Sequence, residues 1–168
     1  MKFVLVLGLA FCCSVVGANV LNVNKSKRWV RNNEPYKVEP GLEVGDELEG
    51  MFIGNPHYYI SFTDGAQGRT ILEIRIGQAS TSIQHTSGCE GYGPSFKIFR
   101  DAVTTNEFQR ITVKLKKDGL VFSLDDRNDQ VLKLKGCSFP WQSVKFIEFG
   151  GDCKKTYGNW RNFLIDRD

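Results

Sequence analysis

The stretch ITVKLKKDGLVFSL, residues 111–124, decides the fold class. Apolar residues alternate with polar ones on both sides of a central turn, at Ile111, Val113 and Leu115 and again at Leu120, Phe122 and Leu124. Successive side chains of a β-strand point to opposite faces, and Asp118-Gly119 favours a tight turn between antiparallel strands. The stretch therefore predicts a β-hairpin with one apolar face.

The same period of two recurs outside this hairpin. From Tyr36 onwards we interpret short alternating runs as strands, near residues 58–62, 72–76, 96–98, 132–134 and 144–149. Turn-forming residues separate the runs, at 64–65, 77–79, 117–119, 125–129 and 150–151. No stretch has a helical period. Short strands with closely spaced turns predict a single all-β domain over residues 36–168, an antiparallel β-sandwich of jelly-roll type.

The hairpin extends into a meander that ends near Lys135. Its polar face carries four lysines, Lys114, Lys116, Lys133 and Lys135, which share one surface if the strands pair in sequence order. We interpret them as a solvated face that resists aggregation, with a heparin-like or anionic-lipid partner as the alternative.

Residues 1–18 have the pattern of a secretory signal peptide, with Lys2 before an apolar run and Ala18 before the expected cut. The run is shorter than the ~20 residues that span a bilayer, so we expect cleavage, secretion to the extracellular space and no transmembrane segment. Residues 19–35 are rich in Asn, Lys and Arg and are predicted to form a flexible N-terminal arm. Within this arm, Asn24-Lys25-Ser26 is a candidate glycosylation site.

The charge balance is close to neutral. The chain has 22 Lys and Arg against 19 Asp and Glu, a net charge of +3, and loss of Lys2 leaves about +2. A dedicated nucleic-acid binder is more basic, so we expect no nucleic-acid partner. Hydrophobic residues make up 41% of the chain, enough for a core. Without a coiled-coil or helical interface, we expect a monomer or a weak dimer.

Three cysteines remain after the signal peptide is removed, Cys89, Cys137 and Cys153. An oxidising compartment favours one disulfide, and without closely spaced ligands we expect no metal site. If the strands near 131–135 and 144–149 are antiparallel neighbours, Cys137 and Cys153 lie roughly 20 Å apart, beyond the ~7 Å that a disulfide allows. Cys89 and Cys153 both lie in Gly-containing loops, so the prediction is a bond between them, and three free thiols are the alternative.

Four short sequence motifs point to a particular protein family, which the alternating pattern alone does not do. They are Leu72-Glu73-Ile74-Arg75-Ile76-Gly77 with Ser80-Thr81-Ser82-Ile83, His57-Tyr58-Tyr59-Ile60, Trp141 with Val144-Lys145-Phe146-Ile147-Glu148-Phe149, and Tyr157-Gly158-Asn159-Trp160. Together they resemble the farnesoic acid O-methyltransferase-like domain family over residues 48–160. Leu72 stands where that family usually has Tyr, and Gln78-Ala79 where it has Gly-Trp. The resemblance implies a compact β-sandwich in a secreted invertebrate protein.

Methyl transfer would need a Gly-rich turn between a strand and a helix to hold S-adenosylmethionine. The chain offers the pair Gly150-Gly151, which is predicted as a turn that ends a strand. His57 and His85 are candidate bases, but no G-x-S-x-G elbow or cysteine-protease string accompanies them. We therefore expect no catalytic residue, no cofactor and no enzymatic activity.

Two functions remain. The first is a secreted, non-enzymatic module that binds a glycan or another polar surface ligand, with a venom, salivary or defence role. Aromatic rings beside polar side chains suit such a ligand, and the candidate binding residues are His57, Glu73, Arg75, Asn159, Trp160 and Arg161. Core packing is the alternative for Trp160, and the galectin strings H-x-N-P-R and W-x-x-E are absent.

The second function is a terpenoid carrier or a methyltransferase-related protein, as the family name suggests. Its small apolar ligand would lie among Phe52, Phe62, Phe96, Phe122, Phe146 and Phe149. The same rings could equally fill the core of a sandwich.

Overall fold

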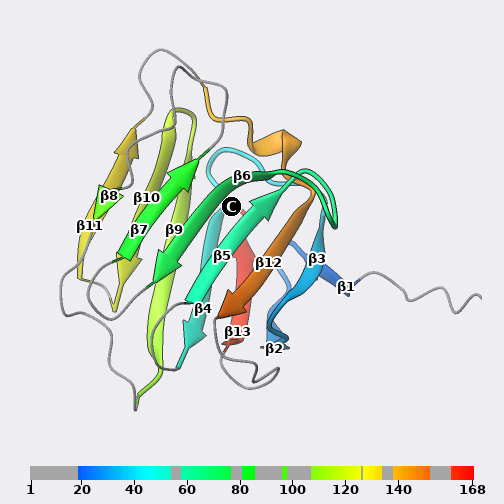
Figure 1. Ribbon diagram of the computed structural model, residues 1–168, viewed down its shortest axis with the longest axis horizontal. Coiled ribbons are helices and arrows are strands. Elements are labelled where there is room, and N and C mark those ends of the chain that lie inside the picture. Colours follow the sequence, from blue (N-terminus) through cyan, green and yellow to red (C-terminus); the bar gives the residue numbers. More distant parts are fainter. Residues whose placement is uncertain are drawn as a thin grey trace, which may run out of the picture.

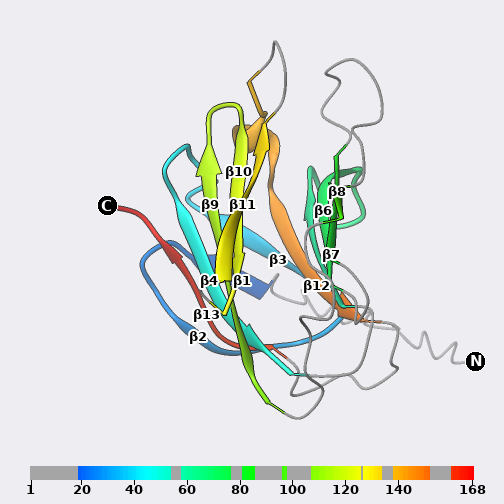
Figure 2. The same ribbon diagram turned by 90° about the vertical axis from the view of Figure 1, so that its left-hand side faces the viewer.

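The computed structural model describes residues 19–53, 58–76, 81–85, 96–97, 107–125, 127–133, 138–151 and 160–168. Within these residues the chain forms two β-sheets, and the single helical element is the short 3-10 turn η1 (Trp141–Ser143). The two sheets lie face to face (Figure 1, Figure 2). The buried hydrophobic side chains form one core cluster. The predicted antiparallel β-sandwich is confirmed. No helix in the described part of the chain is long and apolar enough to cross a membrane.

Sheet A has seven strands in the order β1-β3-β12-β5-β6-β7-β8. Their bounds are β1 Asn19–Asn22, β3 Glu34–Glu39, β12 Phe146–Gly151, β5 Tyr58–Thr63, β6 Thr70–Ile76, β7 Thr81–His85 and β8 Phe96–Lys97. Sheet B has six strands in the order β11-β10-β9-β4-β13-β2. Their bounds are β11 Arg127–Lys133, β10 Gly119–Leu124, β9 Gln109–Lys116, β4 Glu47–Phe52, β13 Trp160–Asp166 and β2 Lys27–Val30. Neighbours pair antiparallel except β1 with β3, which are parallel.

The β9–β10 hairpin forms as the sequence predicts. Lys116 pairs with Gly119 across the turn, and Gly119 has a φ of 151°, which residues with a Cβ rarely adopt. β11 then adds to β10, and the register aligns Lys133 with Gly119. Lys114 and Lys116 of β9 lie on one face of the sheet. The three-stranded meander is therefore confirmed; Lys135 lies outside the described residues.

Aromatic rings from both sheets build the centre of the core. Trp160 of sheet B packs against Phe149 of sheet A and Phe52 of its own sheet, with ring centroids 5.3 Å apart in both pairs. At the end of the sandwich near η1, Trp141 donates from Nε1 to the Lys116 carbonyl at 2.8 Å and covers Phe62. A buried indole N–H needs such an acceptor, because an unpaired polar group inside the core is costly.

The N-terminal segment is part of the sandwich, and the prediction of a flexible arm over residues 19–35 is wrong. β1 joins sheet A beside β3, while β2 joins sheet B beside β13. Each strand contributes a buried side chain, Leu21 and Val30 respectively. The polar composition of the segment misled the prediction, because both are edge strands on which Asn, Lys and Arg face solvent.

Two further expectations fail. β11 and β12 belong to different sheets, so the strand adjacency used to separate Cys137 from Cys153 does not exist. All three cysteines lie outside the described residues, and the Cys89–Cys153 bond stays a prediction that non-reducing peptide mapping tests. Gly150 and Gly151 do not form a turn but continue β12, paired with Tyr59 and Tyr58 of β5.

The C-terminal residues tie three segments together through Arg167. Its guanidinium donates to both carboxylate oxygens of Asp46, from Nε at 2.6 Å and from Nη2 at 2.7 Å. Nη2 also donates to the Gly41 carbonyl at 2.7 Å. The Arg167 backbone pairs with the side chain of Asn24, the candidate glycosylation residue, at the turn between β1 and β2. This arrangement closes one end of the sandwich.

Candidate functional site

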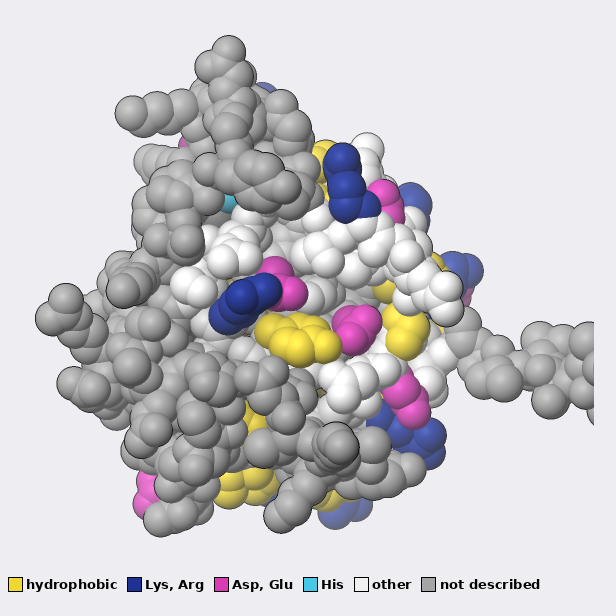
Figure 3. Space-filling model, in the orientation of Figure 1, with side chains coloured by type: hydrophobic (Ala, Val, Ile, Leu, Met, Phe, Trp, Pro, Cys, Tyr) yellow, Lys and Arg dark blue, Asp and Glu magenta, His cyan; other side chains and the backbone are white. Residues whose placement is uncertain are grey.

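The outward surface of sheet A carries a cluster of polar side chains at its centre. Cross-strand register aligns Glu148, Ser61 and Glu73 in one row and Gly150, Tyr59 and Arg75 in the next. We call Tyr59, Ser61, Glu73, Arg75 and Glu148 the polar face. The space-filling view of this side shows acidic, basic and hydrophobic side chains together at its centre (Figure 3).

Glu73 organises one half of the polar face. One of its carboxylate oxygens accepts a hydrogen bond from Ser61 Oγ at 2.9 Å, and the other accepts from Arg75 Nε. The Glu73 side chain is mostly covered, whereas the Arg75 side chain is 60% exposed. Within the described part of the chain, no residue accepts from the Nη atoms of Arg75. The pair therefore presents oriented guanidinium donors to solvent.

Tyr59 forms the other half, and its ring extends over Gly150 of the neighbouring strand β12. A Cβ built at Gly150 would overlap the Tyr59 ring, so the ring occupies the space above the glycine. The hydroxyl lies 3.0 Å from Glu148 Oε1 and 3.2 Å from the side-chain oxygen of Asn33. These contacts hold an aromatic surface beside the Glu73–Arg75 pair, and the close approach of the ring explains the glycine at position 150.

The polar face suits ligand binding more than catalysis. Its side chains project from three paired strands, so their positions are set by the sheet before any ligand arrives. It combines one apolar ring surface with carboxylates, a hydroxyl and a guanidinium. Among the described residues, no group of three or more His, Cys, Asp or Glu could hold a metal ion.

The structure separates the residues that the sequence grouped as a binding site. Glu73 and Arg75 lie together on sheet A, as predicted. Trp160 is 1% exposed and packs in the core, so in this fold its ring is not available to a ligand; Arg161 lies on the outward surface of sheet B. His57 and Asn159 lie outside the described residues.

The second candidate base, His85, is also placed. It ends β7 with its ring buried, 6.5 Å from the ring of Phe139. Burial lowers the pKa of His85 below its ordinary value of 6.5. The side chain faces the core, so it does not contribute to the polar face.

Three members of the polar face were missed, Tyr59, Ser61 and Glu148. The alternation of residues 58–62 already puts Tyr59 and Ser61 opposite the apolar face, so that signal was available. Glu148 could not be found in this way, because it comes next to Ser61 only through the pairing of β12 with β5.

Comparison with protein-family profiles gives no match, and neither does comparison with curated protein sequences. Solved structures do match, and several galectins are among them. Sheep galectin-11 in complex with glycerol superposes with a TM-score of 0.60 at 14% identity, covering 80% of this chain and 99% of that one. A human galectin-16 variant gives 0.64 at 8% identity over 84% of this chain and 100% of that one.

A galectin from Caenorhabditis elegans, LEC-6, gives a TM-score of 0.58 at 13% identity over 82% of this chain and 94% of its own. The chain therefore has a galectin-like jelly-roll fold. At these identities the likeness concerns the fold alone, and the absence of the galectin strings agrees with that limit.

Proposed function

We propose that this protein is a secreted, non-enzymatic module that binds carbohydrate on the polar face of sheet A. The observation that carries the proposal is the flat ring of Tyr59, fixed above Gly150, beside the Glu73–Arg75 pair. The galectin-like fold supports it, because proteins with this fold include lectins. Secretion rests on the leader pattern of residues 1–18.

The chemistry of a sugar matches both halves of the polar face. A pyranose ring has an apolar face of C–H groups that packs on an aromatic ring, and its rim carries hydroxyl groups that both donate and accept hydrogen bonds. The Tyr59 ring offers the first surface. The Glu73 carboxylate offers a hydrogen-bond acceptor and the Arg75 guanidinium offers several donors, at two successive outward positions of β6.

Affinity would come from preorganisation. Ser61 and Arg75 restrain Glu73, and Glu148 and Asn33 restrain the Tyr59 hydroxyl, so few rotamers are lost when a ligand binds. A single sugar would cover a small area, which predicts weak affinity for monosaccharides and tighter binding of oligosaccharides that reach further along the sheet.

The structure offers no observation that favours the apolar-carrier alternative. Four of the six phenylalanines named for it, Phe52, Phe62, Phe122 and Phe149, are buried in the core. Phe52, Phe62 and Phe149 contact the core tryptophans at ring distances of 5.3 to 5.9 Å. The resemblance to the farnesoic acid O-methyltransferase-like domain stays a prediction, and titration with S-adenosylmethionine should show no binding.

Two measurements on the purified protein distinguish the two functions, a glycan array and mass spectrometry of its lipid extract. We expect glycan binding that Arg75→Ala and Tyr59→Ala each reduce about tenfold or more. Lys114→Ala is the matched control, because Lys114 is an exposed, ion-paired residue of sheet B. Binding of the same glycans by Arg75→Ala at wild-type strength, or a co-purified terpenoid with no glycan bound, would overturn the proposal.

A further inference from the structure

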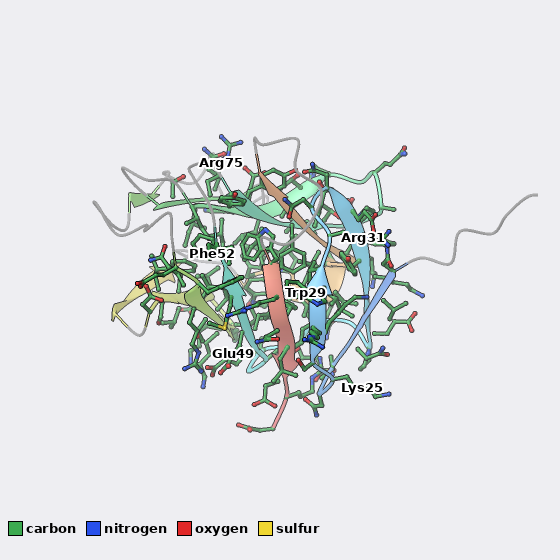
Figure 4. All side chains as sticks on the ribbon, turned by 90° about the horizontal axis from the view of Figure 1, so that it is seen from below. Lys25, Trp29, Arg31, Glu49, Phe52 and Arg75 are labelled. Carbon is green, nitrogen blue, oxygen red and sulfur yellow. The ribbon has the colours of Figure 1, made fainter. Side chains whose placement is uncertain are left out.

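A second row of side chains crosses the outward surface of sheet B. Register aligns Trp29 of β2 with Arg161 of β13, Arg161 with Met51 of β4, and Met51 with Arg110 of β9. Neighbouring strands lie ~4.8 Å apart, so the row extends roughly 14 Å across the sheet. Viewed from below, Trp29 and Glu49 lie on the opposite side of the sandwich from Arg75 (Figure 4). This row is therefore separate from the polar face.

Arg161 is the arginine of this row that has no ion-pair partner among the described residues. Its guanidinium carbon lies 3.4 Å from the centroid of the Phe108 ring, which holds the group by a cation–π contact. In the described part of the chain no carboxylate pairs with Arg161, and its buried Nε has no hydrogen-bond partner. Arg110 on the same row pairs with Glu49 at 2.9 Å, so the two arginines differ in this respect.

Trp29 stands next to Arg161 and is 50% exposed. Its neighbour Val30 points into the core, so the alternation of β2 forces the indole outward onto the same surface as Arg161. An exposed tryptophan on an edge strand leaves a flat apolar surface in water. A ligand that covers it gains this burial as well as contact with the cation.

We propose that Trp29 and Arg161 form a second ligand site, which takes an acidic saccharide. A sugar ring stacks on the indole, and its carboxylate or sulfate group pairs with the Arg161 guanidinium. The charge supports this ligand, because an anion would pair with Arg161, which has no anionic partner in the described part of the chain. A membrane is the poorer match, since the ion pairs Arg110–Glu49 and Lys114–Glu47 on the same surface would have to lose water beside a single exposed ring.

The test is calorimetric titration of the mature chain at low salt with two probes, a heparin-derived hexasaccharide and an oligogalacturonate. The first carries sulfates and carboxylates and the second carboxylates alone, so they distinguish the two anions. We expect Arg161→Gln and Trp29→Ala each to weaken binding of the better probe about tenfold. Binding should also weaken as salt is raised.

Two arginine controls make the result specific. Arg110→Gln removes a paired cation from the same row, and Arg75→Gln alters the polar face; both should change affinity less than about threefold. Far-UV circular dichroism verifies that each variant is folded, and Arg161→Lys, which keeps the charge without the planar group, should bind between wild type and Arg161→Gln. Failure of this test leaves the sheet A proposal intact, because Arg75 is not part of the site.

Three outcomes would overturn the inference. The first is that Arg161→Gln binds the saccharide with wild-type affinity. The second is that the wild-type chain binds neither probe. The third is that the chain binds phosphatidylserine vesicles through Trp29 and does not bind the saccharides.

Discussion

Removing the Arg167 side chain should destabilise the whole sandwich. Arg167→Ala deletes two charge-assisted hydrogen bonds to Asp46 and leaves its carboxylate, 1% exposed, with the Glu43 backbone N–H at 2.9 Å as its donor among the described residues. Breaking a buried ion pair costs about 3–5 kcal/mol. The Arg167 side chain is 21% exposed, so we expect the lower end, about 3 kcal/mol.

Urea and thermal unfolding of residues 19–168 measure this loss. For a domain of this size, about 3 kcal/mol lowers the Tm by roughly 6–12 °C. The control is Arg75→Ala, which removes an exposed partner of an ion pair and should change the free energy of unfolding by less than ~0.5 kcal/mol. A double-mutant cycle with Asp46→Asn should show a coupling of about 2 kcal/mol. If Arg167→Ala lowers the free energy of unfolding by less than ~1 kcal/mol, the Arg167–Asp46 ion pair behaves as an exposed one and the reasoning is refuted.

Three further results are expected. Burial lowers the pKa of His85, so as the pH falls below 6.5 the unfolded chain binds a proton at this residue before the folded chain does. His85 therefore leaves stability unchanged above that pH and lowers it as the pH drops, and the fall in urea stability should be smaller in His85→Gln. Deletion of residues 19–30 should cost about 3–6 kcal/mol, because Leu21 and Val30 leave the core, whereas removal of a flexible arm would cost nothing. Gly150→Ala should displace the Tyr59 ring and weaken glycan binding as much as Tyr59→Ala, and unchanged binding would contradict the stacking role.

Part of the candidate site was readable in the sequence. The alternation of residues 71–76 puts Glu73 and Arg75 on one side of a strand, and the structure pairs them there. For Trp160, the sequence alone did not predict whether the side chain is exposed or buried. A tryptophan between Asn159 and Arg161 looks like a binding residue in sequence, but its burial depends on Phe52 and Phe149, which reach it from two other strands.

Local pattern determined the β9–β10 hairpin and the central strands β5, β6 and β12 of sheet A, because a period of two and an Asp-Gly turn act within a few residues. Tertiary structure alone decided which sheet each strand joins. The alternation of β13 is the same whether it pairs with β4 or with β6, so the sequence grouped Arg161 with Glu73 although they lie on opposite surfaces. The polar segment of β1 and β2 likewise became ordered only through backbone pairing with β3 and β13, since pairing depends on main-chain groups that every such residue carries.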